Sequence, residues 1–187
     1  MSIKKYLFAD LERQYYYDGI KEKNVTIVGL VKRSFNPRFT PILLYRISHY
    51  LFIKDLVPIA KLVSLINFVI FGIEIGLRCE IGEGLYLPHT VGTVIGANRI
   101  GQNAVIFQGV TVGAKELDLG YHKNKRPNIG DRVVIGAGAK VLGGIQIGDG
   151  VTIGANAVVT KSLPANVVAA GIPACIIREV KQEQDNA

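Results

Sequence analysis

The chain has 187 residues, of which 49% are hydrophobic and 20% charged, with a formal net charge of +7. This composition excludes a disordered or low-complexity chain and predicts one main domain with an attachment. The positive charge predicts an anionic ligand or a solvated basic face. The two cysteines, Cys79 and Cys175, exclude a disulfide scaffold, and the first residues lack a signal sequence, so we expect a cytoplasmic protein.

Residues 1–72 form the first expected domain, a helical segment. Breakers and aromatic clusters divide it into four expected helices: residues 3–17, 20–35, 41–52 and 56–71. We expect Thr40 to cap the third helix, with Pro41 at its first position, because a threonine hydroxyl can satisfy a free N–H group at a helix start.

The segment Val57–Phe71 is strongly apolar, although it contains Lys61 and Asn67. It is shorter than the roughly 18–20 residues that a membrane-spanning helix needs. Two environments remain open: burial against a partner subunit or the end of the β region, and peripheral contact with a membrane surface. The second would place the protein at the inner face of the membrane.

From residue 75 onward an apolar residue recurs every sixth position, usually with glycine after it. The expected inward residues are Ile75, Ile81, Leu87, Val94, Ile100, Ile106, Val112, Ile129, Ile135, Val141, Ile147, Ile153 and Val159. A fixed six-residue repeat with turn glycines predicts a parallel β-helix, in which three hexads close one triangular coil. We therefore expect a mainly β fold with the β-helix at residues 73–164 and a return segment and tail at residues 165–187.

Two interruptions break this repeat. One extra residue lies between Leu87 and Val94, where His89 should bulge outward. The longer interruption, at about residues 114–128, is expected to be an extruded loop, and loops of this length in compact repeats are usually functional or disordered.

Several motifs carry a resemblance to a known family: GIEIG (72–76), GEGLYLPHTVG (82–92), FQGVTVGA (107–114), IGAGAKVLGGIQIGDGVTIGANAVVTKSLP (135–164) and AAGIPACIIRE (169–179). With them the chain resembles left-handed β-helix hexapeptide-repeat acyltransferases, in particular serine O-acetyltransferases and surface-polysaccharide O-acetyltransferases. The resemblance implies a left-handed parallel β-helix with an α-helical N-terminal segment. It also implies a homotrimer that uses acetyl-CoA at active sites between subunits.

His89 is the expected catalytic base. Acetyl transfer to a hydroxyl needs a group that takes the hydroxyl proton near neutral pH, and histidine is suited to this role. The resembling family has a histidine at this motif position. It also has an acidic residue where this chain has Glu74, which the resemblance implies orients the imidazole.

The cosubstrate contacts follow from the same resemblance. The backbone N–H of Gly113 is the expected oxyanion donor. Ala137 and Ala155 match positions that contact pantetheine, and Lys161 and Arg178 match positions that reach the nucleotide phosphates.

The acceptor is where the chain departs from the serine enzymes. Those carry aspartate where this chain has Pro88, and Arg-His-Pro where it has Lys125-Arg126-Pro127. Because proline cannot pair with an ammonium group, we expect a sugar hydroxyl of a surface polysaccharide or its precursor, with serine as the alternative. His122 and Arg126 are expected to line the acceptor pocket.

Two other functions fit a chain with this repeat only under further conditions: metal-dependent catalysis and a purely structural role. A zinc enzyme would need three histidines on the repeat, and His89 alone lies there, so no metal is expected. A non-enzymatic β-helix scaffold stays open. No nucleic-acid partner is expected.

Overall fold

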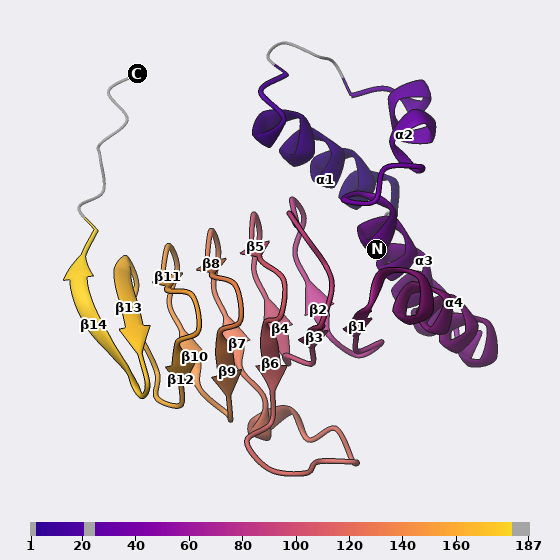
Figure 1. Ribbon diagram of the computed structural model, residues 1–187. Coiled ribbons are helices and arrows are strands. Elements are labelled where there is room, and N and C mark those ends of the chain that lie inside the picture. The colour runs from indigo at the N-terminus through magenta and orange to yellow at the C-terminus, as the bar shows by residue number, and fades with distance from the viewer. Residues whose placement is uncertain (1–2, 21–24, 181–187) are drawn as a thin grey trace.

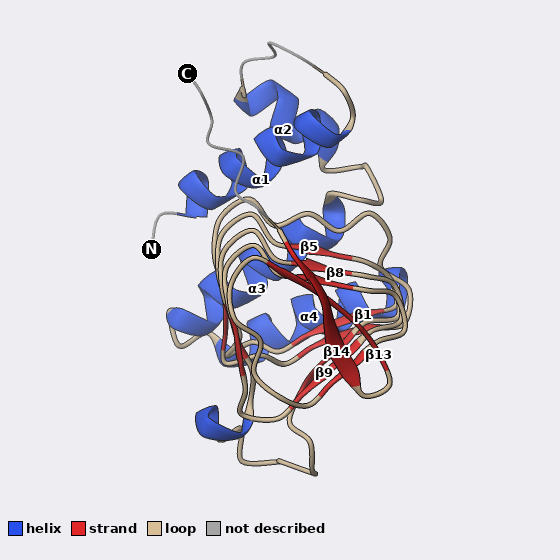
Figure 2. Cartoon of the chain, turned by 90° about the vertical axis from the view of Figure 1, so that its left-hand side faces the viewer, coloured by secondary structure: helices blue, strands red, loops and turns tan. Residues whose placement is uncertain are grey.

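The computed structural model describes residues 3–20 and 25–180. A stack of β coils carries a group of helices at one end and a β-hairpin at the other (Figure 1). Viewed from the hairpin end, the coils superimpose into one outline, with helices behind it (Figure 2). The mainly β architecture predicted from the hexads is confirmed.

Four helices form the N-terminal part: α1 (Ile3–Tyr17), α2 (Ile27–Arg33), α3 (Thr40–Ile53) and α4 (Val57–Phe71). α1 matches its expected bounds. α2 is shorter than the helix expected at residues 20–35, and residues 21–24 lie outside the described part of the chain. α4 ends at Gly72, whose φ of 64° is a left-handed helix cap that glycine adopts without steric cost.

The predicted cap of α3 was wrong. Phe39 occupies the N-cap position and makes no side-chain cap hydrogen bond. The hydroxyl of Thr40 instead donates to the carbonyl oxygens of Ser34 and Asn36, each at 2.8 Å. The Thr40 hydroxyl thus fixes the start of α3 to the preceding turn. A capping rule based on neighbouring residues does not predict this contact.

The strands fall in turn on three faces of a triangular coil. Sheet A contains β1 (Ile73–Ile75), β3 (Thr93–Ile95), β6 (Thr111–Gly113), β9 (Lys140–Leu142) and β12 (Val158–Val159). Sheet B contains β2 (Glu80–Ile81), β4 (Arg99–Ile100), β7 (Asn128–Ile129) and β10 (Gln146–Ile147). Sheet C contains β5 (Val105–Ile106), β8 (Val134–Ile135), β11 (Thr152–Ile153), β13 (Val167–Gly171) and β14 (Ala174–Glu179), and only the β13–β14 pair is antiparallel among these.

The expected inward residues are buried except Val94, which is 38% exposed. Ile95 takes the inward place instead and lies in register between Ile75 and Val112. Ile95 follows Leu87 by eight positions, so the bulge at His89 holds two extra residues rather than one. The next hexad recovers the register by being one residue short, because Ile100 follows Ile95 by five positions.

A buried ion pair joins the helices to the first coil. Arg46 of α3 contacts Asp10 of α1 at 2.8 and 3.0 Å, and both side chains are fully buried. Arg46 also donates to the carbonyl oxygen of Ile81, and the N–H of Leu85 donates to Asp10. Because each charge is both paired and hydrogen-bonded into the coil, the pair fixes where the helices sit.

Candidate active site

His89 lies on the edge of the coil where the chain passes from sheet C to sheet A, here called the C–A edge. The preceding Tyr86 bridges to Val105 of sheet C, and the following Thr93 begins β3 of sheet A. The His89 side chain is exposed. The imidazole is therefore available to a ligand on the surface of the coil.

The C–A edge continues from His89 toward the hairpin as a file of turn residues, one per coil: Gln108, Ala137 and Ala155. Backbone hydrogen bonds fix their stacking, since the N–H of Gly138 donates to Gln108 and that of Asn156 to Ala137, at 2.9 and 2.8 Å. Ala137 is half-buried and Ala155 is exposed. Beyond Gln108, the small side chains of Ala137 and Ala155 leave the backbone of this edge open to an extended ligand.

Sequence reasoning missed Gln108. Its Oε1 atom is buried and has no hydrogen-bond partner within the described residues. The bridge between Tyr86 and Val105 places Gln108 on the next coil, directly over His89. The hexads carried the signal for this, because Ile106 is the third expected inward residue after Leu87, and Gln108 and His89 each lie two residues further on.

Glu74 lies on the outer face of β1, opposite Val94 of β3. Two hydrogen bonds hold the His89 turn against the start of that strand: Thr90 Oγ1 donates to Phe71, and the N–H of Gly92 donates to Gly72, both at 2.9 Å. The structure thus brings Glu74 and His89 onto neighbouring coils of one region. Their side chains make no direct hydrogen bond in the part of the chain described here.

Gly113 and Lys161 lie on the opposite side of sheet A, at the A–B edge, where the chain passes from sheet A to sheet B. Gly113 ends β6, and a Cβ atom built on it would meet nothing within 4 Å. Lys161 follows β12 and is exposed. Arg178 is exposed on β14, at the far end of the stack. Gly113, the expected oxyanion donor, and His89, the expected base, are therefore separated by the width of sheet A within one chain.

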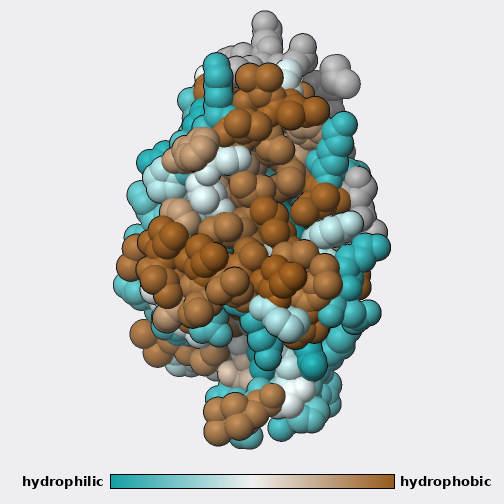
Figure 3. All heavy atoms as spheres, turned by 90° about the vertical axis from the view of Figure 1, so that its right-hand side faces the viewer, coloured by the Kyte–Doolittle hydropathy of each residue, from teal (hydrophilic) through white to brown (hydrophobic). Residues whose placement is uncertain are grey.

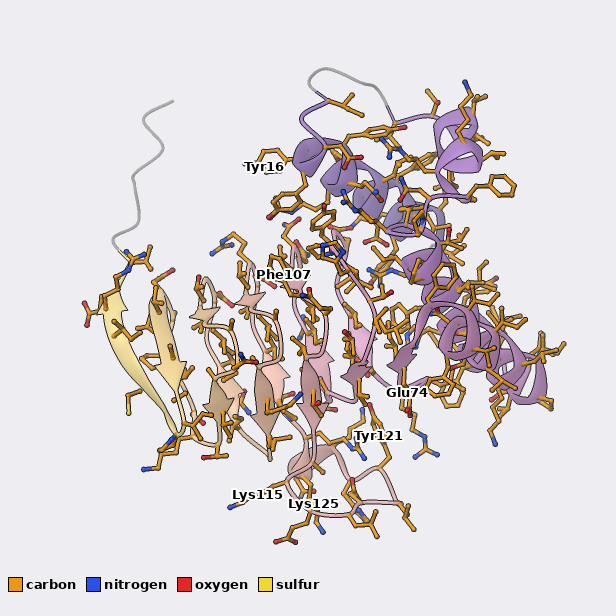
Figure 4. All side chains as sticks on the ribbon, viewed as in Figure 1. Tyr16, Glu74, Phe107, Lys115, Tyr121 and Lys125 are labelled. Atoms are coloured by element: carbon orange, nitrogen blue, oxygen red, sulfur yellow. The ribbon has the colours of Figure 1, made fainter. Side chains whose placement is uncertain are left out.

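The extruded loop leaves the A–B edge between β6 and β7, as expected (Figure 1). Figure 4 shows Lys115, Tyr121 and Lys125 on it. Tyr121 donates to the carbonyl oxygen of Ala97 at 2.7 Å. The guanidinium of Arg126 lies 3.9 Å from the Tyr121 ring centroid and donates to the carbonyl oxygen of Gly96 at 3.0 Å. The base of the loop is thus fixed to the coil.

Asp118 connects the two loop residues that the sequence singled out. It accepts from Arg126 Nε at 3.1 Å and lies 2.6 Å from His122 Nδ1. The hydrogen bond to His122, followed by those from Arg126, lowers the pKa of the Asp118 carboxyl. The His122 ring stays 62% exposed. Arg126 is engaged within the loop, and neither side chain lies on the edge that carries His89.

Cys79 is fully buried in the core of the coil. Burial raises the pKa of its thiol to about 12, so it is not a nucleophile at neutral pH. Among the described residues there is no group of three or more histidine, cysteine or acidic side chains that could hold a metal ion. No helix in the described ranges is long and apolar enough to cross a membrane.

Comparisons with known proteins agree with this geometry. Residues 126–161 match the family described as "Bacterial transferase hexapeptide (six repeats)". A serine acetyltransferase of Helicobacter pylori is 45% identical over 140 residues, which cover 74% of this chain and 80% of the relative. A serine acetyltransferase of Synechococcus elongatus is 38% identical over 143 residues, which cover 75% of this chain and 57% of the relative. The chain thus spans less than two thirds of this second relative.

Solved structures show the same likeness over nearly the whole chain. The crystal structure of serine acetyltransferase from Neisseria gonorrhoeae has a TM-score of 0.82 and 31% identity, and the match covers 96% of this chain and 68% of that one. A serine acetyltransferase solved in complex with CoA has a TM-score of 0.79 and 31% identity, with 94% of this chain and 70% of that one covered. The relatives and structures named here are serine acetyltransferases, and none of them is a polysaccharide acetyltransferase.

Proposed function

Since the chain belongs to the serine acetyltransferase family of hexapeptide-repeat transferases, we propose that it moves an acetyl group from acetyl-CoA to the hydroxyl of serine. The observation that carries this proposal is the exposed imidazole of His89 at the head of an open file of small residues on the C–A edge. A thioester lying along that file would present its carbonyl carbon near the imidazole. Ala137 and Ala155 would then contact the pantetheine chain.

The proposed reaction needs one base and one anion-binding group. His89 takes the proton as the serine oxygen attacks the thioester carbonyl, and the resulting tetrahedral oxyanion accepts from the Gly113 N–H. The C–S bond then breaks, and the imidazolium returns its proton to the thiolate, which leaves as CoA. The negative charge of the Glu74 carboxylate favours the charged imidazolium, because β1, which carries Glu74, lies beside the turn that carries His89.

A complete site requires two chains in this proposal. His89 and Gly113 lie at opposite edges of sheet A, so the C–A edge of one copy must face the A–B edge of another. A ring of three copies around an axis parallel to the coil gives every chain this arrangement. Lys161, on the A–B edge, would then face a cosubstrate lying on its neighbour, and the cation suits a phosphate. Arg178 is proposed to reach the same phosphates from β14.

The surface of α4 supports assembly. Only Ala60 and Asn67 of this helix are buried, and the exposed side chains are mostly large and apolar. Figure 3 shows this apolar surface on the face of the molecule that carries the helices. Large apolar patches of this kind on a soluble chain mark interaction surfaces. Val91 and Val94 extend the exposed apolar surface onto sheet A, which a neighbouring copy would cover.

If Val57–Phe71 contacts a membrane surface instead, the same apolar face would bind lipid. A trimer that buries α4 would stay in solution when mixed with vesicles. Sedimentation of purified protein with vesicles of anionic lipid, together with its mass in solution, separates the two. A trimer that does not co-sediment supports assembly, and a monomer that co-sediments supports the membrane surface.

The acceptor is tested by thiol release from acetyl-CoA with L-serine and with a panel of free and nucleotide-linked sugars. We expect release with L-serine and its loss in His89→Ala at an unchanged oligomeric mass. Retention of the rate by His89→Ala would overturn the catalytic role of His89.

A sugar hydroxyl is the second candidate acceptor, and Pro88 is the observation that favours it. Proline beside the base offers no charge for the serine ammonium, and Arg126 is engaged by Asp118 and Gly96. Turnover with a sugar and none with L-serine would select this candidate. His122, whose free ring edge is exposed, is the loop residue proposed to contact either acceptor across the subunit boundary.

A further inference from the structure

A cleft of about 660 Å³ lies between the helices and sheet B, on the side of the A–B edge and away from the C–A edge that carries His89. Tyr6 of α1 and His49 and Phe52 of α3 line one wall, and Arg78 and Arg99 lie on the coil side. The proposed acetyl transfer uses none of these residues. The volume is in the range of roughly 300–1,000 Å³ that is typical of small-molecule sites. We call this space the helix cleft.

The helix cleft carries an excess of positive charge. Its lining contains Arg78, Arg99 and Lys123 against the single carboxylate of Glu80. Lys123 lies 3.6 Å from Glu80, so that carboxylate is already paired. Arg78 and Arg99 form no ion pair with any described residue. Arg78 lies 5.9 Å from the Tyr121 ring centroid, a contact that leaves its N–H donors available. Two guanidinium groups without a carboxylate partner at one opening are suited to a phosphate, which they can bind through several N–H donors.

His49 adds a directional acceptor to the opposite wall. Its Nδ1 lies 2.8 Å from the carbonyl oxygen of Leu77, and since a carbonyl can only accept, Nδ1 carries the hydrogen. In the neutral ring this leaves Nε2 as a bare acceptor. The ring is 7% exposed and stacks on Tyr45 at a centroid distance of 5.7 Å, so its orientation is fixed.

Phe52 provides a flat apolar surface between these polar groups. Its ring is half-buried and makes no ring contact among the described side chains. Ile53 continues the apolar surface on α3. A planar heterocycle fits such a surface, since aromatic side chains and bases stack through their faces.

We propose that the helix cleft binds a mononucleotide. The guanidinium groups of Arg78 and Arg99 hold the phosphate, the base packs on Phe52, and an exocyclic amino group donates to His49 Nε2. A base with an exocyclic amino group, such as adenine, is favoured over uracil, which has a carbonyl at the corresponding edge. This site does not depend on the identity of the acetyl acceptor or on acetyl transfer itself.

Titration calorimetry of the full chain with adenosine monophosphate (AMP) tests this inference. A parallel titration of Lys161→Glu, which removes a cation of the proposed CoA site, shows whether the binding heat comes from that site instead. We expect AMP to bind more tightly than uridine monophosphate (UMP) and much more tightly than inorganic phosphate. Arg78→Ala and Arg99→Ala should each weaken AMP binding by at least about tenfold. Lys32→Ala, which removes an exposed cation of α2 outside the cleft, is the matched control and should bind as wild type.

His49→Asn keeps a donor for Leu77 and removes the Nε2 acceptor, so it should reduce AMP affinity to that of UMP. Phe52→Leu, which keeps apolar bulk without a flat ring, provides an independent check if His49→Asn does not fold. Absence of AMP binding by the wild type would overturn the proposal. An AMP affinity that Arg99→Ala leaves unchanged would also overturn it. So would inorganic phosphate that binds as tightly as AMP.

Discussion

The two edges of sheet A are built in opposite ways. The C–A edge has an exposed His89 with no side-chain partner among described residues, followed by small residues that leave its backbone open. The A–B edge is covered by a loop that Tyr121, Arg126 and Asp118 fasten to the coil. One edge is thus left free for a ligand and the other is reinforced. This difference is what the proposed sharing of one site between two chains rests on.

The largest expected effect is on turnover, where variants of the two edges should differ. His89→Ala on the C–A edge should lower the turnover number for thiol release by about 10²–10⁴-fold, because it removes the general base. His122→Ala on the loop should act mainly on the KM for the acceptor. Equal losses of turnover in both variants would contradict the difference assigned to the two edges.

The next effect concerns the file of small residues. Ala155→Phe should raise the KM for acetyl-CoA by about tenfold or more, because its ring would occupy the path assigned to pantetheine. Ala165→Phe makes the same change at an exposed turn between sheets B and C. If both variants bind acetyl-CoA alike, the cosubstrate does not follow the C–A edge.

The reinforcement of the A–B edge is tested through stability. Arg126→Ala removes the hydrogen bonds to Asp118 and Gly96 and should lower the midpoint of thermal unfolding by about 3–6 °C. Lys125→Ala removes a neighbouring exposed cation and should leave the midpoint within about 1 °C. A midpoint for Arg126→Ala equal to that of wild type would show that the loop is not fastened as described.

The smallest expected effect concerns the reactivity of the two cysteines toward iodoacetamide. Cys79 lies beneath the A–B edge, and burial raises the pKa of its thiol from 9.0 to about 12. At pH 8 only about one part in 10⁴ of it is thiolate, so iodoacetamide should label exposed Cys175 and spare Cys79. Mass spectrometry of peptides after a timed exposure distinguishes the two. Rapid labelling of Cys79 would show that this edge opens.

The β-helix could be predicted from sequence because its coils repeat one local pattern, an inward apolar residue at about every sixth position. Ile75, Ile135 and Val159 are inward for the same reason, and glycine at the turns marks each corner. The bulge at His89 was misjudged because Val94 and Ile95 are both apolar, and only pairing with β1 and β6 decides which one points inward.

Side-chain partners far apart in sequence were not predictable in this way. The contacts of Asp118 with His122 and Arg126 depend on how the loop folds. The hydroxyl of Thr40 contacts carbonyls of the preceding turn, which a capping rule based on neighbouring residues does not include. Local pattern therefore predicted the scaffold, and tertiary contacts determined how its edges differ.

Mixing two inactive variants tests the shared site most directly. His89→Ala disables the C–A edge, and Lys161→Glu disables the A–B edge at limiting acetyl-CoA. Each should be nearly inactive alone. If the two edges of one site come from different chains, trimers reassembled from an equal mixture should recover roughly a quarter of wild-type thiol release. If both edges of a site belonged to the same chain, the mixture would stay as inactive as its components.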